Sequence, residues 1–276
     1  MAAIMRGQPV STGSTDGNFL RANSSNAEST NYPIHPNPTG FTIQNFGGGT
    51  NASGSTYIYI AIRRPHKPPS AGTDVFDIDT FSGSGSAEVI STTFTVDANL
   101  TAWRNRSYWP TLIDRLRGGP KELYTENSNA EYTNNTPAEF DFQTGLQLFN
   151  YSGDSGYNLV SYSFKRAPEF FDVVTYTGNS TNLRDVTHNL SVTPEMIWVK
   201  NRDRTSDWIV WHKDFSSAAD SYINLNLGST VGASTDMWGD GLHTSTTFEL
   251  GLQTAVNKSG EGHVAFLFAS KAGISK

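Results

Sequence analysis

The sequence contains no cysteine, and it has little of several other features on which functions depend. Without cysteine the chain forms neither disulfides nor thiolate metal sites. No apolar run approaches the length of a membrane span, so we expect no membrane insertion. Charged residues are only 17% of the chain and its net charge is −6, which leaves no general attraction for nucleic acid. Neither a membrane nor a nucleic acid is therefore an expected partner.

Signals for helices and for catalytic sites are also scarce. No long window shows apolar residues at helical spacing. The six histidines are scattered, and the chain has neither a nucleophile elbow nor a phosphate-binding loop. Asp74, Asp77 and Asp79 crowd one segment, but they lack the glycine and the final glutamate of a calcium loop. We therefore expect no catalytic residue, no metal site and no cofactor, and we do not expect an enzyme.

One unit of about 100 residues recurs along the chain. The segment 76–83, FDIDTFSG, returns 95 positions later as FDVVTYTG. Arg104-Asn105-Arg106 returns 96 positions later as Lys200-Asn201-Arg202, so Asn105 and Asn201 are expected in equivalent loops. The chain is predicted to contain the closing strands of one repeat, followed by two nearly complete repeats. The expected domains are 1–65, 66–168 and 169–276.

The tetrad Asn-x-Ser-Gly marks the closing part of each repeat. It occurs at 51–54, 150–153 and 257–260, each time before an apolar or alternating segment. The tetrad has the pattern of a glycosylation sequon, but Asn and Gly also tolerate positive φ, so we interpret it as a turn. Residues 1–65 would hold closing strands without opening ones and are not expected to fold alone. The strands expected there are 19–20, 41–46 and 57–62.

Residues suited to strands and turns are abundant. Aromatic residues make up 12% of the chain, and its 25 glycines are accompanied by many Ser, Thr and Asn. Aromatic and β-branched side chains suit pleated sheets, while Gly and Asn suit tight turns. Ile197, Val199, Phe266 and Phe268 are expected to be core residues of the last repeat. Six to eight short strands per repeat predict an all-β fold of tandem antiparallel β-sandwiches, jelly-roll or lectin-like.

Tryptophans are the side chains that suggest a binding site. Trp208 and Trp211 fall on one predicted strand, and Trp238 is near them in sequence. Sugar-binding sandwiches present aromatic faces to a pyranose ring, so these three residues are candidates for glycan contact. The alternative is packing, because tryptophan carries a large apolar area and fills sandwich interiors. Alternation along the strand places either Trp208 or Trp211 outward, and both interpretations stay open.

The recurring segments resemble tandem β-repeat modules in virion structural proteins of tailed bacteriophages, notably tail-fibre and other appendage proteins of marine phages. The resemblance is carried by residues 171–179 (FDVVTYTGN), 188–202 (HNLSVTPEMIWVKNR) and 264–273 (VAFLFASKAG). A second signature joins Leu116-Arg117-Gly118 to a following Asn129-Ala130-Glu131. The resemblance implies a class of protein and brings no catalytic residues with it.

The resemblance implies a virion protein that is synthesised in the host cytoplasm. We expect a tail-fibre or tail-associated appendage module acting in adhesion to the host surface or in virion assembly. Its expected partners are other virion proteins, a bacterial surface glycan and further copies of itself, with a homotrimer preferred. Two alternatives stay open: a capsid decoration or head-fibre protein that binds the shell, and a glycan-degrading enzyme, which needs two placed carboxylates.

Overall fold

The computed structural model divides into two compact units, Met1–Pro65 and His66–Lys276. The second unit is described at residues 66–134, 138–140, 142–148 and 155–275. The first unit is described at residues 3–4, 17–21, 25–26, 29–32, 34–37, 40–43 and 52–60. Within these ranges the only helices are the single turns η1 (Gly72–Asp74) and α1 (Thr254–Asn257), so the all-β prediction is confirmed. No helix of the described chain has the length and apolar character to cross a membrane.

The described part of the first unit consists of short antiparallel strands. β2 (Gly17–Arg21) lies between β1 (Ala3–Ile4) and β3 (Ser29–Tyr32), while β4 (Ile34–Asn37) pairs with β5 (Gly40–Ile43). The strand predicted at 19–20 is part of β2, and β5 covers the described part of the one predicted at 41–46. The strand predicted at 57–62 is wrong over 57–60, which belong to no sheet, while residues 61 and 62 lie outside the described residues.

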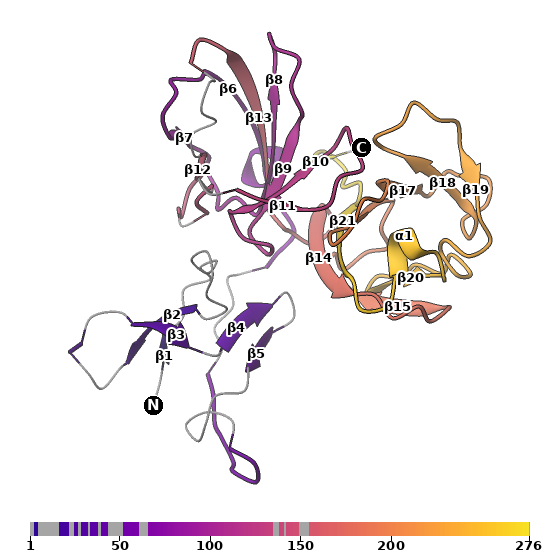
Figure 1. Ribbon diagram of the computed structural model, residues 1–276, viewed down its shortest axis with the longest axis horizontal. Coiled ribbons are helices and arrows are strands. Elements are labelled where there is room, and N and C mark those ends of the chain that lie inside the picture. The colour runs from indigo at the N-terminus through magenta and orange to yellow at the C-terminus, as the bar shows by residue number, and fades with distance from the viewer. Residues whose placement is uncertain are drawn as a thin grey trace. The chain divides into compact units, whose positions relative to one another are not determined.

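The second unit contains two repeats whose described strands follow the same order along the chain (Figure 1). The strands of the first repeat are β6 (Phe76–Ser82), β7 (Glu88–Ile90), β8 (Ala98–Trp103), β9 (Thr111–Asp114), β10 (Lys121–Tyr124), β11 (Tyr132–Thr133), β12 (Leu146–Leu148) and β13 (Asn158–Phe164). Those of the second repeat are β14 (Phe171–Thr177), β15 (Arg184–Thr187), β16 (Met196–Asn201), β17 (Ile209–His212), β18 (Ser221–Asn224), β19 (Gly232–Ala233), β20 (Thr247–Leu250) and β21 (Gly262–Phe268).

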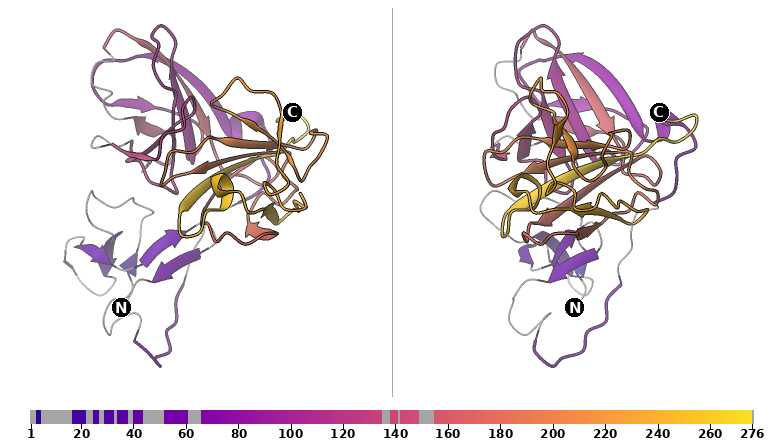
Figure 2. Two further views of the ribbon diagram at one scale, coloured as in Figure 1. Left: turned by 45° about the vertical axis from the view of Figure 1, so that its right-hand side comes forward. Right: turned by 90° about the vertical axis from the view of Figure 1, so that its right-hand side faces the viewer.

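Each repeat is a sandwich of one large and one small antiparallel sheet (Figures 1 and 2). The large sheet of the first repeat has the order β6-β13-β8-β9-β10-β11, and that of the second has the order β14-β21-β16-β17-β18-β19. The small sheets are β7-β12 and β15-β20. Because each strand has a counterpart at the same place in the other repeat, the prediction of tandem β-sandwich repeats is confirmed.

The distance in sequence between equivalent residues grows along the repeat. It is 95 at the first strand (Phe76 to Phe171) and 98 at the third, where the loop after β8 matches the loop after β16. The side chains of Asn105 and Asp203 accept the backbone N–H of the first residue of β13 and of β21, at 2.8 and 2.6 Å. The predicted equivalence of Asn105 with Asn201 is therefore wrong by two residues. Arg-Asn-Arg resembles both Lys-Asn-Arg and the overlapping Arg-Asp-Arg, which is its structural counterpart.

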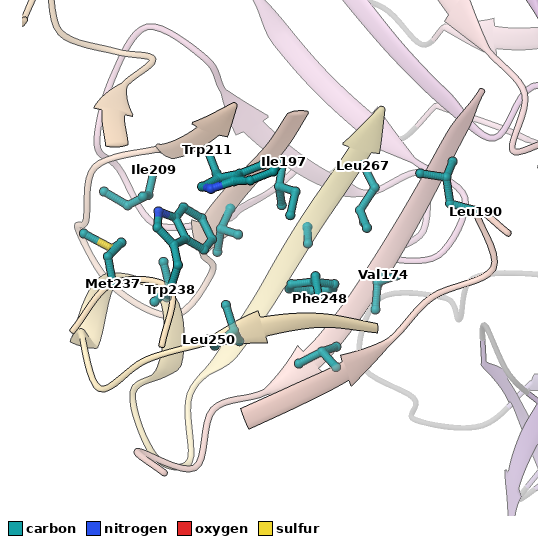
Figure 3. Close-up of a cluster of buried hydrophobic side chains, with 14 of the residues drawn as sticks. Val174, Leu190, Ile197, Ile209, Trp211, Met237, Trp238, Phe248, Leu250 and Leu267 are labelled. Carbon is teal, nitrogen blue, oxygen red and sulfur yellow. The ribbon is translucent and has the colours of Figure 1, made fainter. Parts of the chain in front are cut away.

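In the described part of the second unit, three apolar clusters fill the spaces between the sheets. One lies inside each sandwich, between its large and its small sheet; the cluster of the second repeat is drawn in Figure 3. The third lies between the two repeats, where side chains from both large sheets meet. It includes Ala98, Leu112 and Leu123 of the first repeat and Val173, Val264 and Phe266 of the second. Each large sheet therefore has a core on both of its faces.

Because the large sheet is buried on both faces, the sequence predicts core residues but not the face of the sheet that each of them takes. Ile197 and Val199 are fully buried inside the second sandwich, and Phe266 is buried between the repeats, as predicted. Phe268 is only partly buried at the edge of the inter-repeat cluster. Strands covered on both sides read as continuous apolar runs, and such a run does not tell which face a given residue takes.

The tetrad at residues 257–260 leads into a turn in which Glu261 N donates to Lys258 O, which confirms the interpretation as turn chemistry for this copy. Asn51 and the copy at 150–153 lie outside the described residues. The side chain of Asn257 has no solvent exposure. Its Oδ1 accepts N–H groups from Asn179 and Arg184, at 3.0 and 2.9 Å, and its Nδ2 donates to the carbonyls of Thr181 and Gly251. Gly260 adopts φ +78°, which favours glycine. An asparagine enclosed in this way cannot accept a glycan.

Substitution of Phe266 tests the inter-repeat core. Its ring stacks on Phe171 at 6.4 Å and lies 6.2 Å from the ring of Trp208, both of which are buried. We expect Phe266→Ala to lower the free energy of unfolding by about 3–5 kcal/mol, measured by denaturant titration. Ile78→Ala, at an exposed strand position, is the control and should cost less than about 1 kcal/mol. A similar small loss for Phe266→Ala would contradict a shared core.

Burial of His263 makes stability depend on pH. The ring is fully enclosed, stacks on Tyr176 at 5.1 Å, and contacts the Asn201 amide nitrogen and the Glu261 carbonyl through its two nitrogens. Burial lowers the pKa of His263 from 6.5 to about 4, although the Glu261 contacts act in the opposite direction. The unfolded chain therefore binds a proton that the folded chain does not bind between these two pH values, and folding weakens as pH falls through that window.

We expect this histidine to remove about 2 kcal/mol of stability between about pH 7 and about pH 5. The measurement is urea unfolding at both pH values for the wild type and for His263→Gln, which keeps a polar group and does not titrate. The variant should lose clearly less stability over this interval than the wild type does. Equal losses would show that His263 is protonated in the folded chain.

Candidate functional site

The structure places all three candidate glycan-contact tryptophans in the interior. Trp208 and Trp238 have no exposed surface and Trp211 is 4% exposed. Each indole N–H also has a protein acceptor: the carbonyl of Tyr124 for Trp208, of Ala218 for Trp211 and of Ser221 for Trp238. A sugar ring needs an open aromatic face, so glycan contact by these residues is wrong and the packing alternative holds. Figure 3 shows Trp211 and Trp238 inside the second sandwich.

Exposed aromatic rings gather instead in the first repeat, on the loop between β8 and β9. Residues 104–110 of this loop read Arg-Asn-Arg-Ser-Tyr-Trp-Pro. Tyr108 is 43% exposed and Trp109 is 44% exposed. Tyr124, from the end of β10, lies next to Trp109 with its ring centroid 5.2 Å away. We refer to Arg106, Tyr108, Trp109, Tyr124 and Tyr157 as the aromatic patch.

The members of the aromatic patch touch one another in a row. The Arg106 guanidinium lies over the rings of Tyr157 and Tyr108, 4.8 and 4.7 Å from their centroids. Tyr108 and Trp109 follow with a centroid distance of 5.8 Å and an angle of 30° between their planes. Tyr108 also contacts the buried Trp103, with a centroid distance of 4.5 Å. Contacts of this kind hold the rings in defined orientations, while nearly half of the surface of Tyr108 and of Trp109 stays exposed.

Backbone hydrogen bonds fix the loop that carries the rings. Arg104 N donates to Asn158 O at 2.8 Å, and the Asn105 side chain accepts the Asn158 N–H in return. At the other end, Thr125 N donates to Pro110 O, and the Thr111 hydroxyl donates to Trp109 O. The loop is therefore tied to β13 and to β10 at its two ends, and an aromatic surface on it is preorganised.

A buried carboxyl lies beside the aromatic patch. Tyr124 donates its hydroxyl proton to Glu122, and the Asn134 amide donates to the other oxygen of the same carboxylate. Burial raises the pKa of Glu122, although both of these hydrogen bonds act against the shift. Burial also raises the pKa of Tyr124, and the charge of Glu122 adds to that effect. The Tyr124 hydroxyl therefore stays protonated at neutral pH and orients its ring.

The second repeat shows that folding does not require the patch. By register, Tyr108 and Trp109 correspond to Ser206 and Asp207, and Tyr124 corresponds to Asn224. The equivalent loop thus forms with no aromatic residue at these positions. A partly exposed Tyr-Trp pair that folding does not require is better explained by a ligand than by stability.

The contact between the two repeats holds Tyr124 of the aromatic patch in place. Trp208 of the second repeat donates its indole N–H to Tyr124 O at 2.9 Å. Nearby, Glu131 accepts hydrogen bonds from Arg202 of the second repeat and from Arg117 of its own. Burial alone would raise the pKa of Glu131, but the two guanidinium groups hold it below its ordinary value. The two repeats therefore position Tyr124 together.

The patch offers binding chemistry and shows no metal chemistry. Neighbouring exposed rings suit a ligand that has apolar faces edged by polar groups. Among the residues that the structure describes, no three His, Cys, Asp or Glu side chains gather as a metal site. Sequence reasoning considered only the tryptophans of the second repeat. The signal that could have found the patch is the pair Tyr108 and Trp109, because this pair lies in a polar loop where neither a strand nor a core requires aromatic residues.

Stability measurements separate the exposed from the buried tryptophans. Trp208→Ala should lower the free energy of unfolding by about 3–5 kcal/mol, because it empties a fully enclosed site. Trp109→Ala should lower it by less than about 1.5 kcal/mol, because the ring loses only its contacts with Tyr108 and Tyr124. Both variants are measured by urea unfolding of the full chain. Comparable losses would mean that Trp109 is a core residue and that the patch is not a surface.

Comparisons with known proteins give one match. No curated protein and no solved structure matches the chain. Residues 71–276 match a protein-family model, and this range begins just before β6 and includes both repeats. The match covers most of the sequence, and the chain belongs to the family described as Domain of unknown function (DUF7483).

Proposed function

We propose that this chain is a non-enzymatic adhesion module of a phage virion, of the tail-fibre or appendage type, which binds bacterial surface glycans through the aromatic patch. The observation that carries the proposal is the pair of exposed rings, Tyr108 and Trp109, held at defined angles on a rigid sandwich. The virion setting rests on the resemblance of residues 171–179, 188–202 and 264–273 to phage appendage repeats. Synthesis in the host cytoplasm and contacts with other virion proteins belong to the same proposal.

A glycan suits the patch for a geometric reason. The C–H faces of a pyranose ring are apolar, while its hydroxyl groups point outward around the ring edge. Tyr108 and Trp109, two neighbouring and partly exposed rings whose planes differ by 30°, offer apolar surface for such a ring. Because the loop is already ordered, binding costs little conformational entropy.

Two alternative functions each rest on a specific feature of the chain. A capsid decoration protein would use the stiff pair of sandwiches only as a shell-binding body, and it would need no glycan. A glycan-degrading enzyme would use Glu122, whose raised pKa is a property of general acids. Both oxygens of that carboxylate, however, accept hydrogen bonds from Asn134 and Tyr124. Cleavage of a glycan also requires a second carboxylate across a cleft.

A glycan array with the full chain tests the proposal. We expect binding to a subset of bacterial surface polysaccharides, and a loss of at least about tenfold in affinity for Trp109→Ala and for Tyr108→Ala. Leu242→Ala, at an exposed apolar position of the second repeat, should bind like the wild type. A chain that bound no glycan would favour the shell-binding alternative. Binding that survives both patch substitutions would place the glycan site elsewhere.

Reducing-end release from a bound polysaccharide decides between binding and hydrolysis. We expect none from the wild type, and unchanged glycan affinity for Glu122→Gln, which keeps the shape of the side chain. Release by the wild type that Glu122→Gln abolishes would establish the enzyme instead.

A further inference from the structure

Tyr132 is a half-exposed aromatic side chain beside the aromatic patch. It lies on β11, the edge strand of the large sheet of the first repeat (Figure 1), and its exposed fraction is 50%. A single exposed apolar side chain is ordinary on a protein surface, and it indicates a binding site only where it continues a larger surface. The position of Tyr132 relative to the patch therefore decides its meaning.

The sheet register places Tyr132 on the same face as Tyr124 of the patch. Tyr132 lies opposite Glu122 across the β10–β11 pair, and Glu122 and Tyr124 are two positions apart on β10. Residues directly opposite each other, and residues two apart on one strand, share a face of the sheet. Tyr124 and Tyr132 are therefore diagonal neighbours, whose Cα atoms lie about 7–8 Å apart.

This face of β10 and β11 is turned away from the second repeat. Leu123, which lies between Glu122 and Tyr124 on β10, belongs to the inter-repeat cluster, so its two neighbours take the opposite face. The contact between the repeats therefore does not cover the side chain of Tyr132, which is half-exposed with both repeats in place.

The rings form a series that crosses three segments of the chain. Trp109, on the loop between β8 and β9, lies 5.8 Å from Tyr108 and 5.2 Å from Tyr124, measured between ring centroids. Tyr132 on β11 continues the series beyond Tyr124. Glu122 neighbours both of these tyrosines, and its carboxylate accepts the hydroxyl proton of Tyr124. The surface thus combines aromatic rings with polar groups among them.

The second repeat forms the same pair of strands without an aromatic residue at this position. By register, Glu122 and Tyr132 correspond to Tyr222 and Gly232. A Cβ atom at Gly232 would lie 2.8 Å from the ring of Tyr222, so the second repeat has no room for a side chain there. Folding of the strand pair therefore does not require Tyr132, and this ring is present in the repeat that carries the aromatic patch.

We infer that the glycan site extends across β10 to Tyr132 and that its ligand is a chain of several consecutive sugar units. This inference rests on the proposed function and adds the form of the ligand to it. A pyranose ring is similar in size to the ring of one tyrosine, so a single sugar covers only part of the series from Tyr108 to Tyr132. Consecutive sugars can place an apolar face on each ring in turn, with their hydroxyl groups near the polar groups among the rings.

Titration calorimetry of the full chain with fragments of different length tests the inference. The probes are a disaccharide and a hexasaccharide prepared from the polysaccharide that binds most strongly in the glycan array. We expect the wild type to bind the hexasaccharide at least about tenfold more tightly than the disaccharide. Tyr132→Ala should lose this gain and keep the affinity for the disaccharide, because Tyr108 and Trp109 are unchanged.

Two further variants control for the ring and for the strand. Tyr132→Phe keeps an aromatic ring and should keep most of the gain in affinity. Thr133→Ala, at the next and also exposed position of β11, lies on the opposite face and should bind both fragments like the wild type. The unfolding midpoints of all three variants should match that of the wild type, because both positions are exposed.

Each other result overturns the inference. Equal affinity of the wild type for both fragments would limit the site to the aromatic patch and leave the proposed function standing. An unchanged hexasaccharide affinity in Tyr132→Ala would place the additional contacts elsewhere. An equal loss for both fragments would show that Tyr132 supports the patch and does not extend it. A wild type that bound no polysaccharide would remove the proposed function and this inference together.

Discussion

The contact between the two large sheets is the constraint on which the rest of the structure depends. Each sandwich has a small second sheet, and the opposite face of its large sheet would be open to water if the repeat stood alone. The inter-repeat cluster closes both open faces with one another, using Phe266 from one repeat and Leu112 from the other. The segment joining β13 to β14 is short, so the ends of the two strands stay together. The pair of repeats is therefore the smallest body in which both large sheets have a core on each side.

This pairing gives equivalent loops different surroundings. The loop after β16 faces the first repeat: Ser206 N donates to Ser128 O, and Arg202 pairs with Glu131. The loop after β8 keeps the same backbone anchors but turns aromatic rings outward. One loop type thus serves as an internal contact in one repeat and as a candidate ligand surface in the other. Duplication of the repeat provides both kinds of loop, because the strands that hold a loop form whichever residues its tip carries.

The sequence predicted the strands and the repeat better than it predicted which side chains are exposed. The repeated segment FDVVTYTG, residues 171–178, forms β14 in all but its final glycine, because strand-forming residues that end at a turn residue leave little ambiguity. Trp208 and Trp211 were ambiguous because alternation identifies an outward face only where one side of a sheet is solvated. The aromatic patch was not predicted, and the reason is the lack of any periodic pattern. Tyr108 and Trp109 lie in a loop, where no periodicity separates packed from exposed residues.

The segment Tyr57–Ile60 shows where local sequence stops determining structure. Its alternating tyrosines and isoleucines have strong preferences for strands, and the tetrad and basic pair on either side repeat those around β13 and β21. Those two strands are stable because each has a neighbour on both sides and a core on both faces. A strand forms hydrogen bonds only with neighbouring strands, so the same preference yields an extended chain that belongs to no sheet at residues 57–60. Strand preference alone therefore does not place Tyr57–Ile60 in a sheet, although the same pattern does so at β13 and β21.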